Sequence, residues 1–232
     1  MAGPMEPRRT RTNNPQALRR RVIDATAALF QARGYHATST QDVMREAGVT
    51  AGALHHHFPT KKALALAVIE ESVAGAVDET WVAPVVRARS TARGVRDVLE
   101  CIADGLDERG RVQGCPVNNL ALELSFGDRD FQRAIHAIFE RWREAIAKKV
   151  RADRAAGRFT KGRPDAVAAF VVASYSGAMA LAKASQSAEP LRICARHLAE
   201  YFAERSARRT RTSRPRRRRP LGRRRRRHHV RG

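Results

Sequence analysis

Residues 38–61 read TSTQDVMREAGVTAGALHHHFPTK, and this stretch carries the clearest structural signals in the chain. A helix is predicted at its start, because a hydroxyl side chain followed three residues later by one that reaches back forms a capping box. Thr38 with Gln41 fits this pattern, and so does Ser39 with Asp42. The residues alone leave both helix starts open.

Two breaks divide the stretch into two short helices. Gly48 ends the first helix, and Thr50 caps the second. The second helix reaches Phe58 and ends at Pro59, because proline cannot continue a helix. Upstream, residues 15–34 carry apolar side chains at helical spacing. Three short helices with a tight turn between the last two predict a helix-turn-helix.

The second short helix has the composition of a DNA-reading helix. Such a helix lies in the major groove with its N-terminal side chains against base edges. Val49, Leu54 and Phe58 are expected to anchor it on the core. The residues expected to face outward are small or polar: Thr50, Ala51, Gly52, Ala53, His55 and His56. Missing side-chain bulk at the glycine lets the backbone approach the groove closely.

Phosphate contacts are expected on either side of this helix, because they set its register on DNA. Ser39 and Thr40 lie at the start of the preceding helix, where hydroxyls and free amides favour an anion. Lys61 lies in the first turn of the following helix. A cation there is unfavourable for the helix dipole, which indicates a phosphate partner.

The same stretch closely resembles the DNA-binding domain of TetR-family regulators. The matching residues are Gly34, Tyr35, Thr38, Ser39, Ala47, Gly48, Val49, Gly52, Leu54, His57, Phe58 and Lys61. The resemblance implies an all-α homodimer, with an N-terminal three-helix helix-turn-helix domain and a larger helical ligand-binding and dimerisation domain. It further implies a repressor that binds a palindromic operator on double-stranded DNA and is released by a small-molecule or electrophile ligand.

His55 departs from the family pattern, which has a tyrosine that commonly contacts a phosphate. The contact then passes through the imidazole or is lost. Since an unperturbed histidine titrates near pH ~6.5, His55 either gives DNA binding a mild pH dependence or is a neutral hydrogen-bonding substitute. A metal site on His55, His56 and His57 is not expected, because neighbouring helical residues point about 100° apart. No cofactor is expected.

Charge and composition divide the chain into four parts. We expect a flexible basic arm at 1–14, the helix-turn-helix domain at 15–60, the ligand-binding and dimerisation domain at 61–206, and a disordered Arg-rich tail at 207–232. The net charge is +22, and the tail holds 14 Arg without an acid, which leaves +8 for the rest. The tail either adds salt-sensitive phosphate contacts or reflects only the chain's general preference for Arg.

Further helices are expected near 91–109, 116–126, 128–156, 164–185 and 189–206. The uncharged segment Ala166–Ala182 is at the short limit for a bilayer span, so we expect a buried helix in a soluble, cytoplasmic protein. Its small residues permit close approach of a second helix: Ala173, Ser174, Ser176, Gly177, Ala178, Ala180 and Ala182. With Leu191, Leu198, Tyr201 and Phe202, two copies are expected to form a four-helix interface.

Gly114–Glu123 resembles a stretch of one TetR branch whose members often respond to drugs or reactive small molecules. Pro116 fits the first turn of a helix, which places Cys115 near the N-cap, where a thiol gains thiolate character. Cys115 either senses electrophiles or oxidants, aided by a cation such as Lys183, or is a small buried filler. Cys101 and Cys194 are expected to pack on apolar helix faces. The expected pocket lining is Cys115, Trp81, Asn118, Asn119, Glu123, Phe126, Trp142, Tyr175 and Met179.

Two other functions compete with a ligand-released repressor. One is an enzyme, such as a thiol hydrolase that uses Cys115 with His136, although the chain has none of the common catalytic motifs. The other is a protein that coats DNA through the Arg-rich tail, which predicts affinity without sequence preference.

Overall fold

The computed structural model describes residues 14–206, and these form helices without a strand, which confirms the all-α prediction. Apart from Asn14, the expected basic arm and Arg-rich tail lie outside these residues. The elements, with η for π-helical stretches, are α1 (Pro15–Arg33), α2 (Thr40–Ala47), α3 (Ala51–His57), α4 (Lys61–Ala67), η1 (Val68–Val73), α5 (Ala74–Val77), η2 (Asp78–Val82), α6 (Ala83–Arg87), α7 (Thr91–Arg109), α8 (Pro116–Leu124), α9 (Arg129–Ala155), α10 (Pro164–Ser185) and α11 (Glu189–Ala203).

Local caps fix the start of α2 and α3. The Ser39 side chain accepts a hydrogen bond from the Asp42 amide while the Asp42 carboxylate accepts one from the Ser39 amide, so the capping box is the second of the two expected pairs. The Thr38 hydroxyl instead donates to the Gly34 carbonyl. Thr50 caps α3 through the Ala53 amide, as expected.

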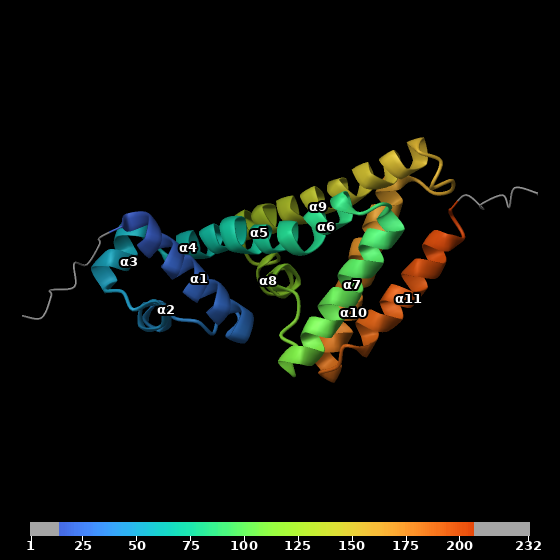
Figure 1. Cartoon of the computed structure of the whole chain (residues 1–232). Helices are drawn as coiled ribbons and strands as arrows, with labels where there is room; N and C mark the ends of the chain where they lie inside the picture. The colour runs from blue at the N-terminus through green and yellow to red at the C-terminus, as the bar shows by residue number, and fades with distance from the viewer. Residues whose placement is uncertain (1–13, 207–232) are drawn as a thin grey trace, which may run out of the picture.

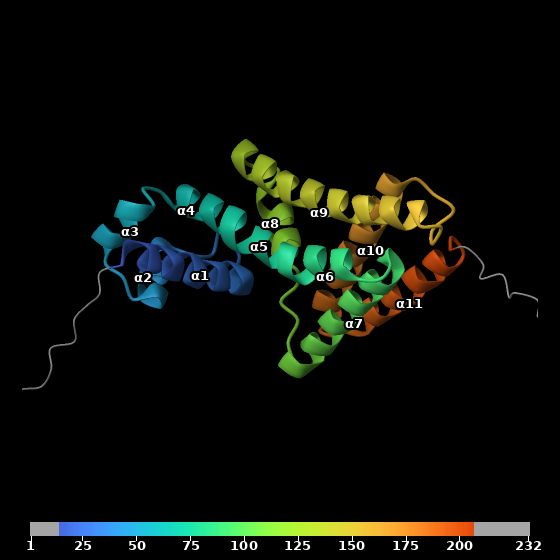
Figure 2. The ribbon, with the colours of Figure 1, turned by 45° about the horizontal axis from the view of Figure 1, so that its top comes forward.

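One long helical run forms the spine of the molecule. The segments α4, η1, α5, η2 and α6 follow one another without a break, and the residues at their junctions keep helical backbone angles. In Figures 1 and 2 this run leaves the α1–α3 cluster at one end and reaches the helices of the C-terminal half at the other. It packs against both α1 and α9, so it connects the two halves of the chain.

The C-terminal half is a group of long helices. α11 packs on α7 and α10, and α10 packs on α9. α10 is long and apolar enough to cross a membrane by length and composition, the one such helix among residues 14–206. It also buries eight residues against its neighbours, including Val171, Tyr175 and Met179. This packing accounts for its apolar composition.

The expectation for the last two helices needs correction. Leu191, Leu198 and Phe202 are almost fully buried inside the single chain, where α11 packs on α7 and α10. Ala178 and Ala182 are buried as well. The regular apolar spacing of α11 therefore serves the core of one chain, and a partner cannot contact those side chains.

Candidate functional site

The outward face of α3 consists of small and polar residues, as the sequence predicts. Leu54 and Phe58 are 2% and 4% exposed and hold the helix on the core. The outward residues Thr50, Ala51, Gly52, His55 and His56 are exposed, and Ala53 is half-buried. A Cβ built at Gly52 would meet no atom within 4 Å. The fold therefore does not require a glycine here, and the surface at Gly52 is open.

The three residues expected to hold phosphate already have partners inside the chain. The Ser39 hydroxyl donates to the Asp42 carboxylate at 2.6 Å, and the Thr40 hydroxyl lies 3.4 Å from the Gln41 side chain. The Lys61 ammonium lies 4.2 Å from the centre of the Tyr35 ring, and burial lowers its pKa. The cation at the start of α4 is thus accounted for without DNA, so the dipole argument for a phosphate loses its force.

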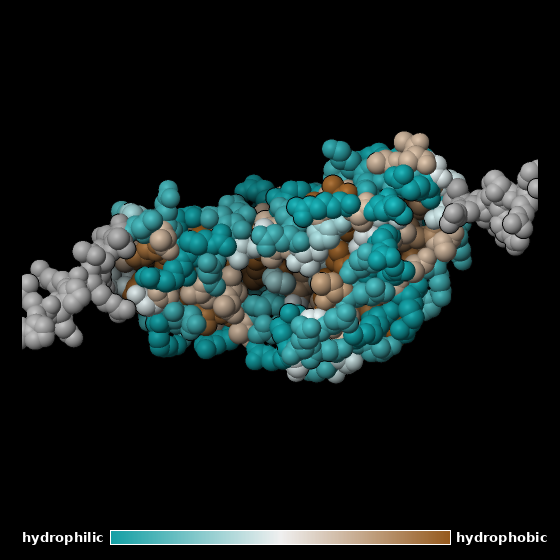
Figure 3. Space-filling view, viewed as in Figure 1, coloured by the Kyte–Doolittle hydropathy of each residue, from teal (hydrophilic) through white to brown (hydrophobic). Residues whose placement is uncertain are grey.

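A cavity of about 340 Å³ lies in the C-terminal half. It brings together five residues of the expected set: Trp81, Cys115, Trp142, Tyr175 and Met179. Its walls come from the long helical run and from α7, α8, α9 and α10. Figure 3 shows a hollowed hydrophobic area near the middle of the molecule, in the region of α8.

The remaining expected pocket residues lie elsewhere. Asn118 accepts a hydrogen bond from the Ser176 hydroxyl at 3.2 Å, and neither Asn118 nor Asn119 lines the 340 Å³ cavity. Phe126 is fully exposed beyond the end of α8. Helical spacing could not separate these residues from the true lining, because which face of α8 meets the cavity depends on distant helices.

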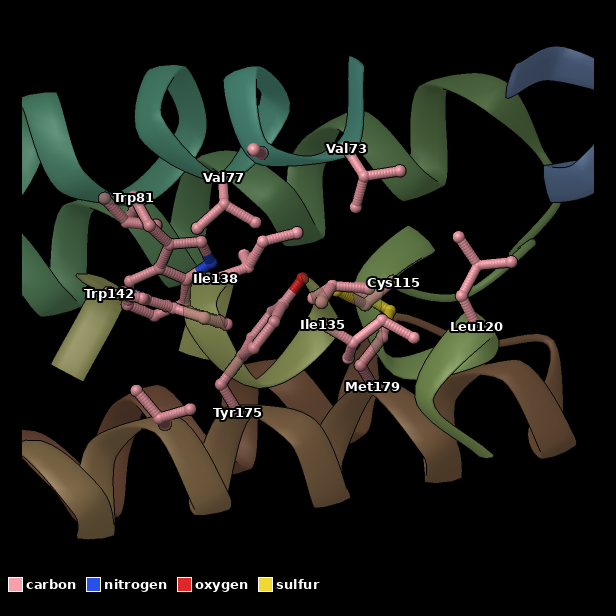
Figure 4. Packing of buried hydrophobic residues seen from close by; sticks show 14 of the residues in the cluster. Val73, Val77, Trp81, Cys115, Leu120, Ile135, Ile138, Trp142, Tyr175 and Met179 are labelled. Atoms are coloured by element: carbon pink, nitrogen blue, oxygen red, sulfur yellow. The ribbon is translucent and has the colours of Figure 1, made fainter. Parts of the chain in front are cut away.

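Three aromatic rings form the inner wall of the cavity. The ring centres of Trp81 and Trp142 are 5.1 Å apart, and Tyr175 lies 4.8 Å and 5.5 Å from them. Figure 4 shows the Tyr175 hydroxyl directed toward the space beside Cys115. Burial, then the neighbouring Cys115 thiol, raises the pKa of Tyr175 well above its usual value, so the phenol stays protonated.

Cys115 is not the activated thiol that its helix position indicates. It lies at the N-cap of α8, as expected, yet it is 5% exposed. Burial raises its pKa, and this effect outweighs the hydrogen bonds from the α8 amides and Tyr175 that lower it. Cys101 also differs from expectation, because it is exposed. The helix-terminus argument is therefore wrong in direction for Cys115.

The pairing of Cys115 with His136 that a thiol hydrolase needs is not assembled. Cys115 is enclosed next to Tyr175, whereas His136 is exposed on α9 and borders a different surface pocket with Phe139. Within residues 14–206, no group of three or more His, Cys, Asp and Glu side chains is arranged to hold a metal ion.

A contact that sequence reasoning missed joins α8 to the N-terminal half. The Glu123 carboxylate accepts hydrogen bonds from the Tyr35 amide at 3.0 Å and the His36 amide at 2.7 Å. Gly34, with φ of +86°, precedes these amides, and a Cβ there would lie 2.9 Å from a Glu123 oxygen. Glycine is required at this turn both for its backbone angle and for the approach of the carboxylate.

A second set of hydrogen bonds lies at the other end of α8. The Gln31 side chain of α1 donates to the Gly114 carbonyl at 2.7 Å. Asn119 donates to Gln31 and to the Gln113 carbonyl, and accepts from Lys183 of α10. Gly114 also lines the cavity, so the hydrogen bond from Gln31 joins α1 directly to the cavity wall.

Two family models match the chain. Residues 22–68 match the model described as bacterial regulatory proteins, tetR family, and residues 91–197 match the C-terminal domain model of LmrA/YxaF-like transcriptional regulators. The helix-turn-helix and the cavity-bearing half are thus matched separately.

Relatives and solved structures agree with these models. The chain is 28% identical over 173 residues to an uncharacterised HTH-type transcriptional regulator of Lactococcus lactis, which covers 75% of this chain and 87% of that protein. It is 26% identical over 182 residues to the HTH-type transcriptional repressor DhaR of a Mycobacterium species, covering 75% and 86%. A TetR transcriptional regulator from Chloroflexus aurantiacus superposes with a TM-score of 0.74 at 28% identity, covering 83% of this chain and 97% of that one.

We predict that Cys101 reacts with iodoacetamide at least tenfold faster than Cys115 in the folded protein. Cys115 is buried and its pKa is raised, so both access and thiolate fraction disfavour it. Mass spectrometry of time-quenched samples measures the two rates, and the same reaction in urea is the control, where the rates should converge. Equal rates in the folded protein would contradict the buried, protonated thiol.

Proposed function

The chain belongs to the TetR family of transcriptional regulators and carries a helix-turn-helix DNA-binding domain, and from this premise we propose that it is a cytoplasmic repressor. In this proposal a homodimer binds a palindromic operator through residues 15–60, and a small molecule bound within residues 61–206 releases it. The observation that supports DNA binding is the exposed face of α3, which has few large side chains. As a transcriptional regulator the chain is not an enzyme.

Operator recognition is assigned to the exposed start of α3. Thr50, Ala51 and Gly52 lie at the N-terminal end of the helix, where a recognition helix contacts base edges. His55 and His56 follow one turn later and are exposed. Phosphate contacts remain assigned to Ser39, Thr40 and Lys61 at the helix starts on either side, although each must then exchange or share its present partner.

We predict that Gly52→Gln lowers operator affinity at least tenfold without loss of thermal stability. The new side chain has open space in the free protein, so only a closely approaching partner meets it. The operator is first selected from random duplex DNA with the unmodified protein, and affinity is then measured by fluorescence anisotropy at fixed salt.

Gly75→Gln is the matched control, because a Cβ at Gly75 also meets nothing within 4 Å and this helical glycine lies away from α3. It should keep operator affinity within about twofold. Unchanged affinity in Gly52→Gln would refute the assignment of α3.

Dimerisation is assigned to the outer face of α10 and α11. Ala173, Gly177 and Ala180 are exposed on α10, in line with the expected close helix approach. Large apolar side chains are exposed on the same two helices: Phe170, Leu181 and Ile193, at 46%, 63% and 42%. An apolar surface of this kind is typical of an interface, and pairing two copies gives the four-helix arrangement with two α3 helices for two half-sites.

We predict that Gly177→Glu converts the dimer into a folded monomer. A Cβ at Gly177 meets no atom of its own chain, so the substitution is harmless within one subunit and places a charge between two closely packed helices. Analytical ultracentrifugation measures the mass, and Gly75→Glu is the control for added charge. A Gly177→Glu protein that remains dimeric would move the interface elsewhere.

Ligand release is assigned to α8. Its first residues, Cys115, Pro116 and Val117, line the cavity, and its last turn holds the α1–α2 connection through Glu123. An occupant that displaces the start of α8 therefore moves the attachment of the DNA-binding half. Differential binding to the two arrangements is what shifts the population away from DNA.

We predict that Glu123→Gln changes operator affinity at least threefold and speeds hydrogen exchange at the Tyr35 and His36 amides at least tenfold. A neutral amide offers one acceptor oxygen in place of a carboxylate that binds both amides. Exchange is followed by mass spectrometry. Glu140→Gln is the control, because within residues 14–206 Glu140 pairs only with Arg143 of its own helix. If both variants behave alike, Glu123 does not position the DNA-binding half.

A further inference from the structure

We infer that the cavity between the long helical run and α7, α8, α9 and α10 binds a ring-bearing apolar molecule with oxygen acceptors, neutral or anionic, and rejects cations. The inference rests on the proposed effector role of that cavity and names its ligand class. It follows from the charge, the hydrogen-bonding groups and the ring geometry of the lining.

The size and composition of the cavity suit a compact apolar ligand. Its volume of about 340 Å³ lies at the lower end of the range for small-molecule sites. Much of its wall is aliphatic, with Val77, Ile102, Leu106 and Met179 among the lining residues. A molecule with one or two rings fits a space of this volume.

The charge of the lining is one-sided. Arg109, the last residue of α7, is the only charged residue among the described residues that line the cavity, and no carboxylate faces it there. Arg109 makes no ion pair within residues 14–206. An ammonium ligand would enter a largely apolar site without a counter-charge, which is costly. Arg109 is exposed, so an anion would meet its guanidinium at the solvent-facing edge of the cavity.

The aromatic wall is not a cage for a cation. A cation binds over a ring face, within about 6 Å of the ring centre, and a cage needs rings spread around it. Here the centres of Trp81, Trp142 and Tyr175 lie 4.8–5.5 Å from one another. The rings therefore fill the space between them. A ligand can pack along one side of the three rings, but the rings do not surround it.

Two buried hydrogen-bond donors near the wall lack an acceptor. The indole N–H groups of Trp81 and Trp142 are buried, and neither has an acceptor among the described residues. The Tyr175 hydroxyl faces the Cys115 sulfur as a donor, and the Trp81 indole neighbours the Tyr175 oxygen without reaching hydrogen-bond geometry. Buried donors without acceptors are rare and costly, and a ligand oxygen entering beside Tyr175 supplies the missing acceptor.

Three probes with one apolar body test the ligand class: 4-cyclohexylbenzoate, 4-cyclohexylbenzamide and 4-cyclohexylbenzylammonium. The chain has two tryptophans, and both line the cavity, so tryptophan fluorescence reports its occupancy directly. Calorimetry on the full chain without DNA gives the dissociation constants. We expect the carboxylate and the amide to bind at least tenfold more tightly than the ammonium.

Two variants locate the groups that select the ligand. Arg109→Met should weaken the carboxylate at least fivefold and leave the amide within twofold, whereas Arg111→Met is the matched control, because Arg111 is exposed and outside the lining. Tyr175→Phe should weaken both the carboxylate and the amide at least threefold, with thermal unfolding confirming that the variant is folded.

The inference is overturned if the ammonium binds as tightly as the carboxylate, if none of the three probes binds, or if Arg109→Met and Arg111→Met behave alike. These measurements contain no DNA, so they are independent of repression. If the probes obey the predicted order but do not weaken operator binding, the ligand class stands and the release step of the proposed function fails.

Discussion

The burial of Leu54 and Phe58 is the constraint on which the DNA-binding half depends. An isolated helix of seven residues is not stable in water, because nucleation is unfavourable and few hydrogen bonds follow it. α3 persists because its two apolar side chains join the core cluster that includes Val22, Ile23 and Leu64. With those contacts made from behind, its front needs no side chains for stability. A surface of Gly, Ala, Thr and His is therefore free to meet DNA.

The two halves of the molecule are connected in three ways. The continuous run from α4 to α6 is a covalent spine, and it begins beside α3 and ends among the helices around the cavity. α8 supplies the second connection, with Gln31 bonded at one end and Glu123 at the other. The ammonium of Lys62, bonded to Asp128 and Asp130, ties the start of α4 to the start of α9. Short, polar contacts thus join both ends of α8 to α1 and to the turn after it.

The cavity combines a neutral thiol, a protonated phenol and two indoles in one apolar space. Desolvation raises the pKa of both Cys115 and Tyr175, because burial penalises the charged form of each. η2, which carries Trp81, is π-helical, and such stretches often occur at functional sites. For the proposed ligand, these features favour recognition by shape and hydrogen bonding over covalent capture at Cys115.

Local sequence predicts the helices of the DNA-binding half, the Thr50 cap of α3 and the exposed residues of α3, but it leaves both Thr38 and Ser39 as candidate caps of α2. These features depend on interactions within about four residues, such as Thr50 with Ala53, and a helix cap acts over that distance in any context. The resemblance to the TetR family predicted the all-α fold of the rest of the chain.

Only the tertiary structure decided which residues line the cavity, how Cys115 is buried, where the stripe of α11 packs and what Glu123 holds. Glu123 and Tyr35 are 88 positions apart, and no local pattern relates them. Helical periodicity shows that a face is apolar, but it does not say which neighbour covers it. That choice follows from the packing of all the helices together, because burial and the pKa of a thiol depend on every element that excludes water from it.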